Sequence, residues 1–215
     1  MWTFLFIILK RWLEKTYNIF IEDQPIVKQN NTIINTAHKK NKLILLSDIW
    51  GAKKADWIAH YIQLLESTFE VVFYDSCALA EVDLSTYTEK ALHHQFTNGG
   101  IDRAVHALDK LENGASHILA FSIGGTIAWK LALRRRTIQS LTCISSTRLR
   151  KETIRPQNLI QLYYGGLDPY KPDITWLAAM KLDYAICTYG DHGIYTDRTF
   201  AKKVCHKIIR TANDG

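Results

Sequence analysis

Short apolar runs that alternate with segments of helical spacing constrain the fold of this chain more than any other feature. Residues 42–47 are almost entirely apolar and end in a polar loop, which is typical of a strand covered on both faces. Residues 55–65 then place apolar side chains on one side of a helix. The pattern predicts further strands at 69–75, 117–121, 140–144, 159–164 and 184–188, and further helices at 101–111, 124–133, 174–180 and 198–209. This alternation predicts an α/β fold, a doubly wound and mostly parallel sheet flanked by helices.

The chain length is that of one ordinary domain, at 215 residues. No repeat or low-complexity linker divides it, so we expect a single domain over residues 1–215, with residues 1–41 as an N-terminal extension or the first strands. Residues 1–9 are strongly apolar, but the charges of Lys10 and Arg11 follow them, which is the wrong polarity for a secretory signal. We expect this stretch to pack as a strand or helix; contact with a membrane surface or a second copy is the less favoured alternative.

The cysteines indicate the cellular compartment of the protein, and its charge indicates which classes of partner to expect. The four cysteines, Cys77, Cys143, Cys187 and Cys205, lack the close pairs of a zinc site or a disulfide framework. Three lie in or beside apolar runs, which predicts buried thiols and a reducing, cytoplasmic location. The formal net charge is +6, but the basic residues are spread along the chain without a nucleic-acid motif, so we expect no nucleic-acid partner. The oligomeric state stays open.

Residues 120–125, Ala-Phe-Ser-Ile-Gly-Gly, place Ser122 between a predicted strand and a predicted helix. The segment resembles the nucleophile elbow, G-x-S-x-G, of the α/β-hydrolase superfamily. Gly124 meets the demand for a small residue two places after the serine, whereas Ala120 replaces the first glycine of the pattern. The alternative is a serine that caps a helix, followed by glycines for close packing. The downstream residues favour the elbow.

A serine nucleophile needs an imidazole to take its proton and a carboxylate to orient that imidazole. The superfamily supplies these groups in the order Ser, Asp, His. Asp168 lies in a glycine-rich loop after the strand predicted at 159–164, and His192 lies in a glycine loop before the last helix, as the resemblance requires. Asp191 is the competing acid, but adjacent side chains on one loop rarely point at each other. The predicted triad is therefore Ser122, His192 and Asp168.

The tetrahedral intermediate of acyl transfer needs two backbone donors. The Ile123 amide, directly after the serine, supplies one. Residues 47–51, Ser-Asp-Ile-Trp-Gly, resemble the corresponding loop of dienelactone-hydrolase-like proteins, which implies that Ile49 supplies the other, with Trp50 as the neighbouring alternative. That family commonly has a cysteine nucleophile, so the serine here favours a more general ester or thioester over a lactone.

The connection between the strands ending at Ile144 and beginning at Leu159 is too short for a large cap, which predicts an open site. Arg148 and Arg150 follow a strand's functional end, and either could contact a carboxylate or phosphate, although a solvated loop is the alternative. Trp50 is a candidate wall of the acyl pocket or a packing residue. The adjacent residues His93 and His94 are expected on a solvated helix, without a metal.

Together these features predict a small serine hydrolase that cleaves a carboxylic ester or thioester through an acyl-enzyme and needs no cofactor. The expected substrate is a small-molecule ester or an acyl group on a carrier. Two alternatives stay open. One is an acyltransferase that uses the same triad, and the other is a non-catalytic binding module of the same fold.

Overall fold

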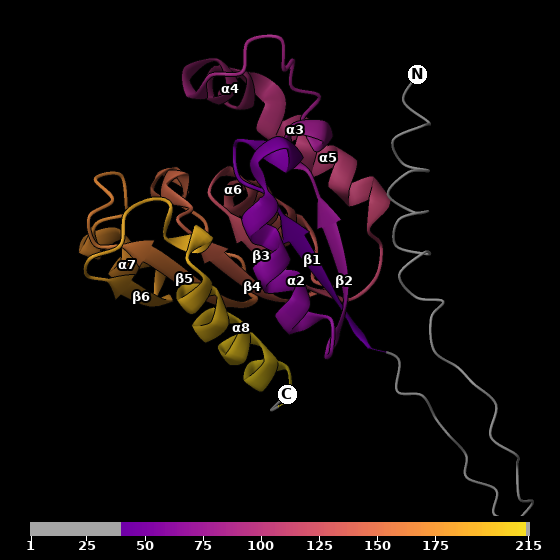
Figure 1. The fold of residues 1–215 in the computed structure, drawn as a ribbon, viewed down its shortest axis with the longest axis vertical. Coiled ribbons are helices and arrows are strands. Elements are labelled where there is room, and N and C mark those ends of the chain that lie inside the picture. Colours follow the sequence, from indigo (N-terminus) through magenta and orange to yellow (C-terminus); the bar gives the residue numbers. More distant parts are fainter. Residues whose placement is uncertain (1–39, 214–215) are drawn as a thin grey trace, which may run out of the picture. The chain divides into compact units, whose positions relative to one another are not determined.

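The computed structural model describes residues 40–213. Within that range, six strands form one all-parallel sheet in the order β2-β1-β3-β4-β5-β6 (Figure 1). They are β1 (Asn41–Leu46), β2 (Phe69–Tyr74), β3 (Ser116–Phe121), β4 (Ile138–Ile144), β5 (Leu159–Gly165) and β6 (Asp183–Cys187). The predicted parallel sheet is confirmed. The expectations for residues 1–39, including packing or membrane contact of residues 1–9, lie outside the described residues.

The helices cover both faces of this sheet. They are α2 (Ala59–Leu65), α3 (Ser76–Leu79), α4 (Glu89–Gln95), α5 (Ile101–Leu111), α6 (Ile123–Arg134), α7 (Ile174–Met180) and α8 (Arg198–Asn213). Helices α2 and α8 pack together on one face, whereas α3, α5 and α6 pack on the other (Figure 1). All helices expected from apolar spacing are present. The apolar spacing predicted neither α3 nor the bounds of α4, which lie in a largely polar connection; the helix at His93 and His94 was expected from that pair of residues alone.

Two apolar cores, one on each face, hold the layers together. In β1, Ile44 and Leu46 belong to the core under α5 and α6, while Leu43 and Leu45 belong to the core under α2 and α8. Successive side chains of a strand point to opposite faces, so an unbroken apolar run supplies both cores. This explains why β1 lacks the apolar-polar alternation of a half-exposed strand.

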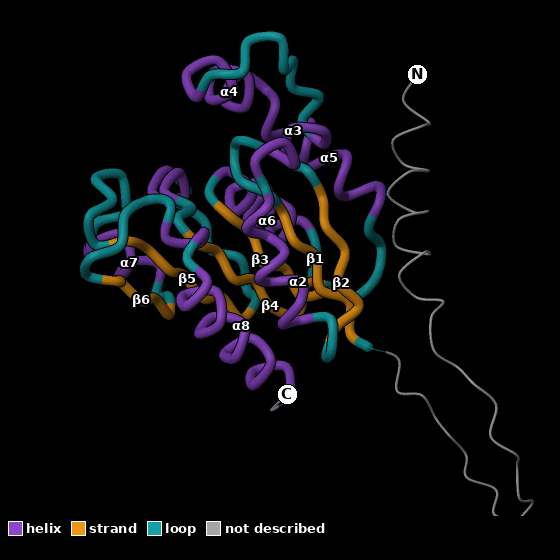
Figure 2. Tube along the Cα trace, in the orientation of Figure 1, coloured by secondary structure: helices purple, strands orange, loops and turns teal. Residues whose placement is uncertain are grey.

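The parallel strands bring the functional loops to one edge of the sheet. All six strands run in the same direction, so the loops after their carboxyl ends gather together (Figure 2). The β4–β5 connection holds only a short 3-10 helix, Thr147–Lys151, and no large cap is inserted there. Helix α4 stands beyond this edge of the sheet (Figure 1) and comes from the connection between β2 and α5.

Candidate functional site

Ser122 occupies a strained turn between β3 and α6. Its backbone has φ 50° and ψ −116°, a conformation that residues other than glycine seldom adopt. The Ser122 amide donates a hydrogen bond to the Ile144 carbonyl at 2.9 Å, which ties the turn to β4. The strand, the sharp turn and the following helix have the shape of the elbow that the sequence resembles. The turn keeps Ser122 partly exposed at the sheet edge.

The residues around the turn are small because backbone and side chains approach closely there. A Cβ atom on Gly124 would lie 2.5 Å from the Ser47 carbonyl oxygen, and one on Gly125 would lie 1.8 Å from Ser146 Oγ. Ala120 is fully buried on β3, in the core under α6. The elbow conformation therefore forms in this chain with alanine in place of the first glycine.

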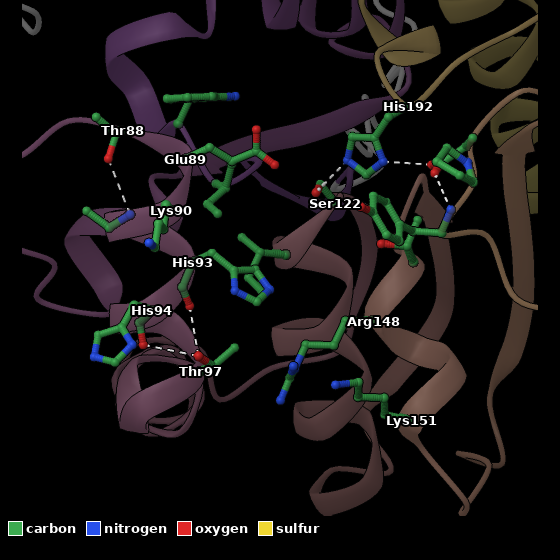
Figure 3. A pocket seen from close by; sticks show the side chains of 18 of the residues that line it. Thr88, Glu89, Lys90, His93, His94, Thr97, Ser122, Arg148, Lys151 and His192 are labelled. Carbon is green, nitrogen blue, oxygen red and sulfur yellow. Dashed lines mark hydrogen bonds and ion pairs between the residues drawn. The ribbon is translucent and has the colours of Figure 1, made fainter.

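Three side chains from three different loops form a hydrogen-bonded chain (Figure 3). Ser122 Oγ lies 3.0 Å from His192 Nε2, and His192 Nδ1 lies 2.7 Å from Asp168 Oδ2. A carboxylate only accepts hydrogen bonds, so Nδ1 carries the proton and Nε2 is left to accept from the serine hydroxyl. The Asp168 side chain is 0% exposed and that of His192 is 41% exposed. The structure thus brings together the three residues of the predicted triad.

The two neighbouring acids have different partners. Asp168 accepts hydrogen bonds from His192 and, through Oδ1, from the Tyr170 amide at 2.9 Å. Asp191 instead accepts from the Gly193 amide at 2.8 Å, within its own loop. The geometry therefore favours Asp168 over Asp191 as the acid beside the imidazole.

Ile49 and Ile123 border the same cavity as Ser122, and their backbone amides are the predicted oxyanion donors. The Trp50 amide donates to Asp48 Oδ1 at 2.9 Å, which removes it as a donor. The Asp48 carbonyl accepts from the Gly51 amide at 3.2 Å, so the N–H of the same trans peptide, which belongs to Ile49, points the opposite way. Among the described residues, neither the Ile49 nor the Ile123 amide has a hydrogen-bond acceptor. Of the two alternatives in this loop, the geometry favours Ile49.

A buried aspartate holds the loop that carries Ile49. Asp48 is 2% exposed, and its Oδ2 accepts a hydrogen bond from the Tyr195 hydroxyl at 2.9 Å. Burial raises the pKa of Asp48, and the hydrogen bonds from Tyr195 and the Trp50 amide oppose part of that rise. The Cys77 thiol donates to the Ile49 carbonyl at 3.2 Å. Tyr195 and Cys77, which sequence reasoning did not select, therefore fix the orientation of this loop.

Trp50 both packs and lines the pocket. Its ring meets that of Tyr87 edge to face, with centroids 5.5 Å apart, and the Lys54 ammonium lies 3.7 Å from its centroid. The Tyr87 hydroxyl donates to the Trp50 carbonyl at 2.5 Å. Trp50 is partly exposed and borders the same cavity as Ser122. The two sequence interpretations of Trp50, packing residue and pocket wall, are thus compatible.

A cavity of about 1210 Å³ adjoins Ser122 and His192. One wall is the 3-10 helix Thr147–Lys151, which contributes the predicted Arg148 and Arg150 and, in addition, Lys151. The other wall is α4, with Lys90 and both adjacent histidines (Figure 3). The cavity is therefore a cleft between two connections that leave different parts of the sheet.

Sequence reasoning missed the contribution of α4 to this cleft. His93 and His94 are exposed on a helix, as expected, but they also border the cavity. The signal for the helix was present: the Thr88 side chain caps α4 by accepting from the Ala91 amide, and Leu92 and Phe96 recur at helical spacing on its buried side. Nothing local to this segment showed that it faces residues 147–151.

The described residues contain no cluster of three or more His, Cys, Asp or Glu side chains placed to hold a metal ion. No helix in the described range combines the length and apolar character needed to cross a membrane.

No family model and no curated protein matches this sequence. Solved structures do match it. A candidate hydrolase of the alpha/beta superfamily from Xanthomonas campestris is 14% identical with a TM-score of 0.59, covering 80% of this chain and 99% of that one. Alpha/beta hydrolase domain-containing protein 10 from mouse is 12% identical with a TM-score of 0.63, covering 82% and 91%. A candidate dienelactone hydrolase from Klebsiella pneumoniae is 11% identical with a TM-score of 0.61, covering 82% and 88%.

Proposed function

Given that residues 40–213 have the α/β-hydrolase fold, we propose that this protein is a serine hydrolase that cleaves a carboxylic ester or thioester. The observation that carries the proposal is the hydrogen-bonded chain from Ser122 through His192 to Asp168, with its serine in a strained turn. A serine that merely caps a helix has no need of either feature. The names of several structural neighbours, which are hydrolases and esterases, agree with this class of reaction.

Acylation follows from the positions of the three side chains. His192 Nε2 takes the proton of the Ser122 hydroxyl as Oγ attacks the carbonyl carbon, and Asp168 stabilises the imidazolium that forms. The negative charge on the carbonyl oxygen is stabilised by the Ile123 and Ile49 amides. When the tetrahedral intermediate collapses, the leaving alkoxide or thiolate receives the proton from His192, and the acyl group stays on Ser122.

Deacylation repeats the same proton transfers with water as the nucleophile. His192 takes a proton from water, the resulting hydroxide adds to the acyl carbonyl, and the proton returns to Ser122 Oγ as the carboxylic acid leaves. The short β4–β5 connection leaves the cleft open, which suits small esters or acyl groups held on a larger carrier. Trp50 borders the acyl end of the cleft in this proposal.

Labelling with a fluorophosphonate, which phosphonylates activated serines, tests the proposal directly. Intact-mass measurement and peptide mapping are expected to place one adduct on Ser122, and the rate of adduct formation is expected to fall strongly in His192→Ala. Ser122→Ala removes the nucleophile and should lower kcat for a chromogenic short-chain ester by roughly 10³-fold or more. The matched control is Ser67→Ala, an exposed serine in the turn before β2.

Circular dichroism and thermal unfolding establish that each variant is folded before its rate is interpreted. Failure of the folded wild-type protein to form any adduct would overturn the proposal and favour a non-catalytic binding role. If Ser122 is labelled as fast in His192→Ala as in the wild type, His192 is not the base.

A further inference from the structure

The cleft beside Ser122 carries positive charge without matching negative charge. Lys90, Arg148 and Lys151 all border it. Within residues 40–213, the four ion pairs are Lys42–Glu112, Lys130–Glu152, Arg135–Asp109 and His192–Asp168, so none involves these three cations. No hydrogen bond from their charged groups to a described residue is present either. Arg148 is only partly exposed, and a guanidinium that is neither paired nor fully solvated favours binding of an anion.

The cations come from two walls that face each other. Arg148 and Lys151 project from the 3-10 helix Thr147–Lys151 toward the side of the cleft on which His93 of α4 lies (Figure 3). Desolvation lowers the pKa of His93, and the positive charges of Arg148 and Lys151 lower it further. The positive charges of Arg148 and Lys151 therefore affect His93 on the opposite wall of the cleft and are not fully screened by solvent.

The acids at this cleft do not neutralise it. Asp168 is occupied by His192 and the Tyr170 amide. Glu89, at the start of α4, is the other carboxylate bordering the cavity; it raises the pKa of His93 but forms no ion pair with a described cation. A single exposed carboxylate against three unpaired cations leaves a net positive cleft.

Arg148 and Arg150, which both lie on the 3-10 helix, are not equivalent. Arg150 donates to the Thr147 and Tyr170 carbonyls at 2.6 and 3.1 Å, and its guanidinium lies 5.8 Å from the Tyr170 ring centroid. These contacts give Arg150 a structural role between two loops. Arg148 has no such contacts, so of the two arginines it is the one available to a ligand.

We propose that the substrate is an ester or thioester that also carries a phosphate or carboxylate, and that Arg148 and Lys151 bind this anion while the scissile carbonyl lies at Ser122. The proposal rests on the proposed hydrolase function and adds its substrate class. A guanidinium offers two parallel N–H donors to such an anion, and the neighbouring ammonium adds a second charge. Since a positively charged cleft also concentrates anionic ligands, the preference is expected to weaken as ionic strength rises.

Two matched substrate pairs test whether the anion sits on the acyl side or on the leaving group. The acyl pair is the 4-nitrophenyl monoester of glutaric acid and the same ester with its free carboxyl methylated. The leaving-group pair is S-acetylpantetheine 4′-phosphate and S-acetylpantetheine. The full-length protein is expected to prefer the anionic member of at least one pair by about tenfold or more in kcat/KM, a size consistent with one or two charge-assisted hydrogen bonds. The pair that shows the preference identifies the position of the anion.

The variants ask whether these two cations produce the preference. In Arg148→Gln/Lys151→Gln, the ratio of kcat/KM between anionic and neutral members should fall to near one. The control Arg136→Gln/Lys110→Gln removes the same two charges at exposed positions outside the cleft and should keep the wild-type ratio. Absence of a preference in both pairs, or a preference that survives loss of Arg148 and Lys151, overturns the proposal.

A titration that needs no turnover separates this proposal from the hydrolase function. In NMR spectra of the full-length protein, inorganic phosphate should raise the pKa of His93, because an anion in the cleft stabilises the protonated imidazole. In Arg148→Gln/Lys151→Gln, the pKa of His93 should start higher and respond less to phosphate. His93→Gln identifies the resonance. If Ser122 fails to label but phosphate still raises the pKa of His93, the hydrolase function and the ester substrate fail while the anion site stands. A pKa of His93 that does not respond to phosphate overturns the anion site.

Discussion

At the scale of single residues, the candidate site depends on side chains outside the predicted triad. Tyr195 donates to Asp48, and its own carbonyl accepts from the buried Tyr61 hydroxyl at 2.9 Å. Asp48 in turn receives the Trp50 amide and leaves the Ile49 amide free. A line of hydrogen bonds thus runs from the core under α8 to one of the two proposed oxyanion donors. Loss of one link leaves a buried carboxylate short of a donor, which is costly.

Tyr195→Phe keeps the aromatic packing and removes only the hydroxyl. We expect the free energy of unfolding to fall by about 1.5–3 kcal/mol at neutral pH, the range for a hydrogen bond to a charged group. The hydroxyl lowers the pKa of Asp48, so its loss raises that pKa in the folded state. At a pH below the pKa of Asp48 in the unfolded chain, this carboxyl is protonated in both states, and the part of the destabilisation that depends on its charge vanishes. That part grows as the pH rises through the pKa of Asp48 in the folded protein.

Urea unfolding of wild type and Tyr195→Phe at acid and neutral pH measures this difference. Tyr163→Phe is the control, because the Tyr163 hydroxyl makes a long hydrogen bond, 3.3 Å, to the amide oxygen of Gln161. A destabilisation of Tyr195→Phe that is independent of pH would show that Asp48 is not charged in the folded protein.

At the scale of elements, the nucleophile turn depends on how closely α6 approaches β1. The space that a Gly124 side chain would need is filled by backbone, with the Ser47 and Leu46 carbonyl oxygens 2.5 and 2.9 Å from an added Cβ. A flexible side chain could rotate away from such a contact, but a strand carbonyl cannot. The helix and the strand must therefore separate if this residue grows.

Gly124→Ala should accordingly lower the free energy of unfolding by about 1–3 kcal/mol, the cost of overpacking a filled site. It should also lower the rate of fluorophosphonate labelling, because separation of α6 from β1 moves Ser122 relative to the Ile49 loop. Gly114→Ala is the matched control, since an added Cβ there meets no atom within 4 Å. Urea unfolding and labelling rates measure both effects; equal stability of the two variants would contradict the close approach of α6 and β1.

At the scale of the whole molecule, two cores on opposite faces of the sheet enclose most of the thiols. Cys77 and Cys143 lie in the core under α5 and α6, and Cys205 lies in the core under α8. Only Cys187, on the edge strand β6, is partly exposed. Burial raises the pKa of Cys77 and of Cys205 to about 12, so little thiolate forms at neutral pH. The expectation of three buried cysteines is confirmed.

Reaction with a chromogenic disulfide reagent should therefore give at most one fast thiol per folded molecule and four in denaturant. The slow thiols should react at rates set by opening of the two cores, so an added denaturant should accelerate them together. Cys187→Ser should abolish the fast phase and leave the other three. Two or more fast thiols in the native protein would contradict the burial of both cores.

How far the sequence anticipated the site can be judged from its loops. Strand 117–121, the turn at Ser122 and the following helix were predicted to within two residues, because apolar periodicity and a serine among small residues are local signals. The loops of Asp168 and His192 were found by the same means. A helix at His93 and His94 was expected, but not the bounds of α4 or its place at the cleft, since the segment from 76 to 100 is largely polar and its local pattern does not show what it faces.

The sequence by itself determined the succession of strands and helices along the chain and the edge of the sheet at which Ser122, Asp168 and His192 gather, because strand-helix alternation implies parallel strands whose carboxyl ends share one edge. The order of the strands within the sheet came only from the structure. Choices between neighbouring residues needed the tertiary structure. It decided that Asp168, rather than Asp191, lies against the imidazole, and that the Ile49 amide is free while that of Trp50 is not.

The tertiary structure alone showed that α4 faces the 3-10 helix of Arg148 across the cleft. The physical reason is the same in each case. Hydrogen bonds, burial and charge act over a few ångströms in space, and the residues that share them here come from connections far apart along the chain. Periodicity reports which face of its own element a residue occupies, but not which distant loop will fold against it.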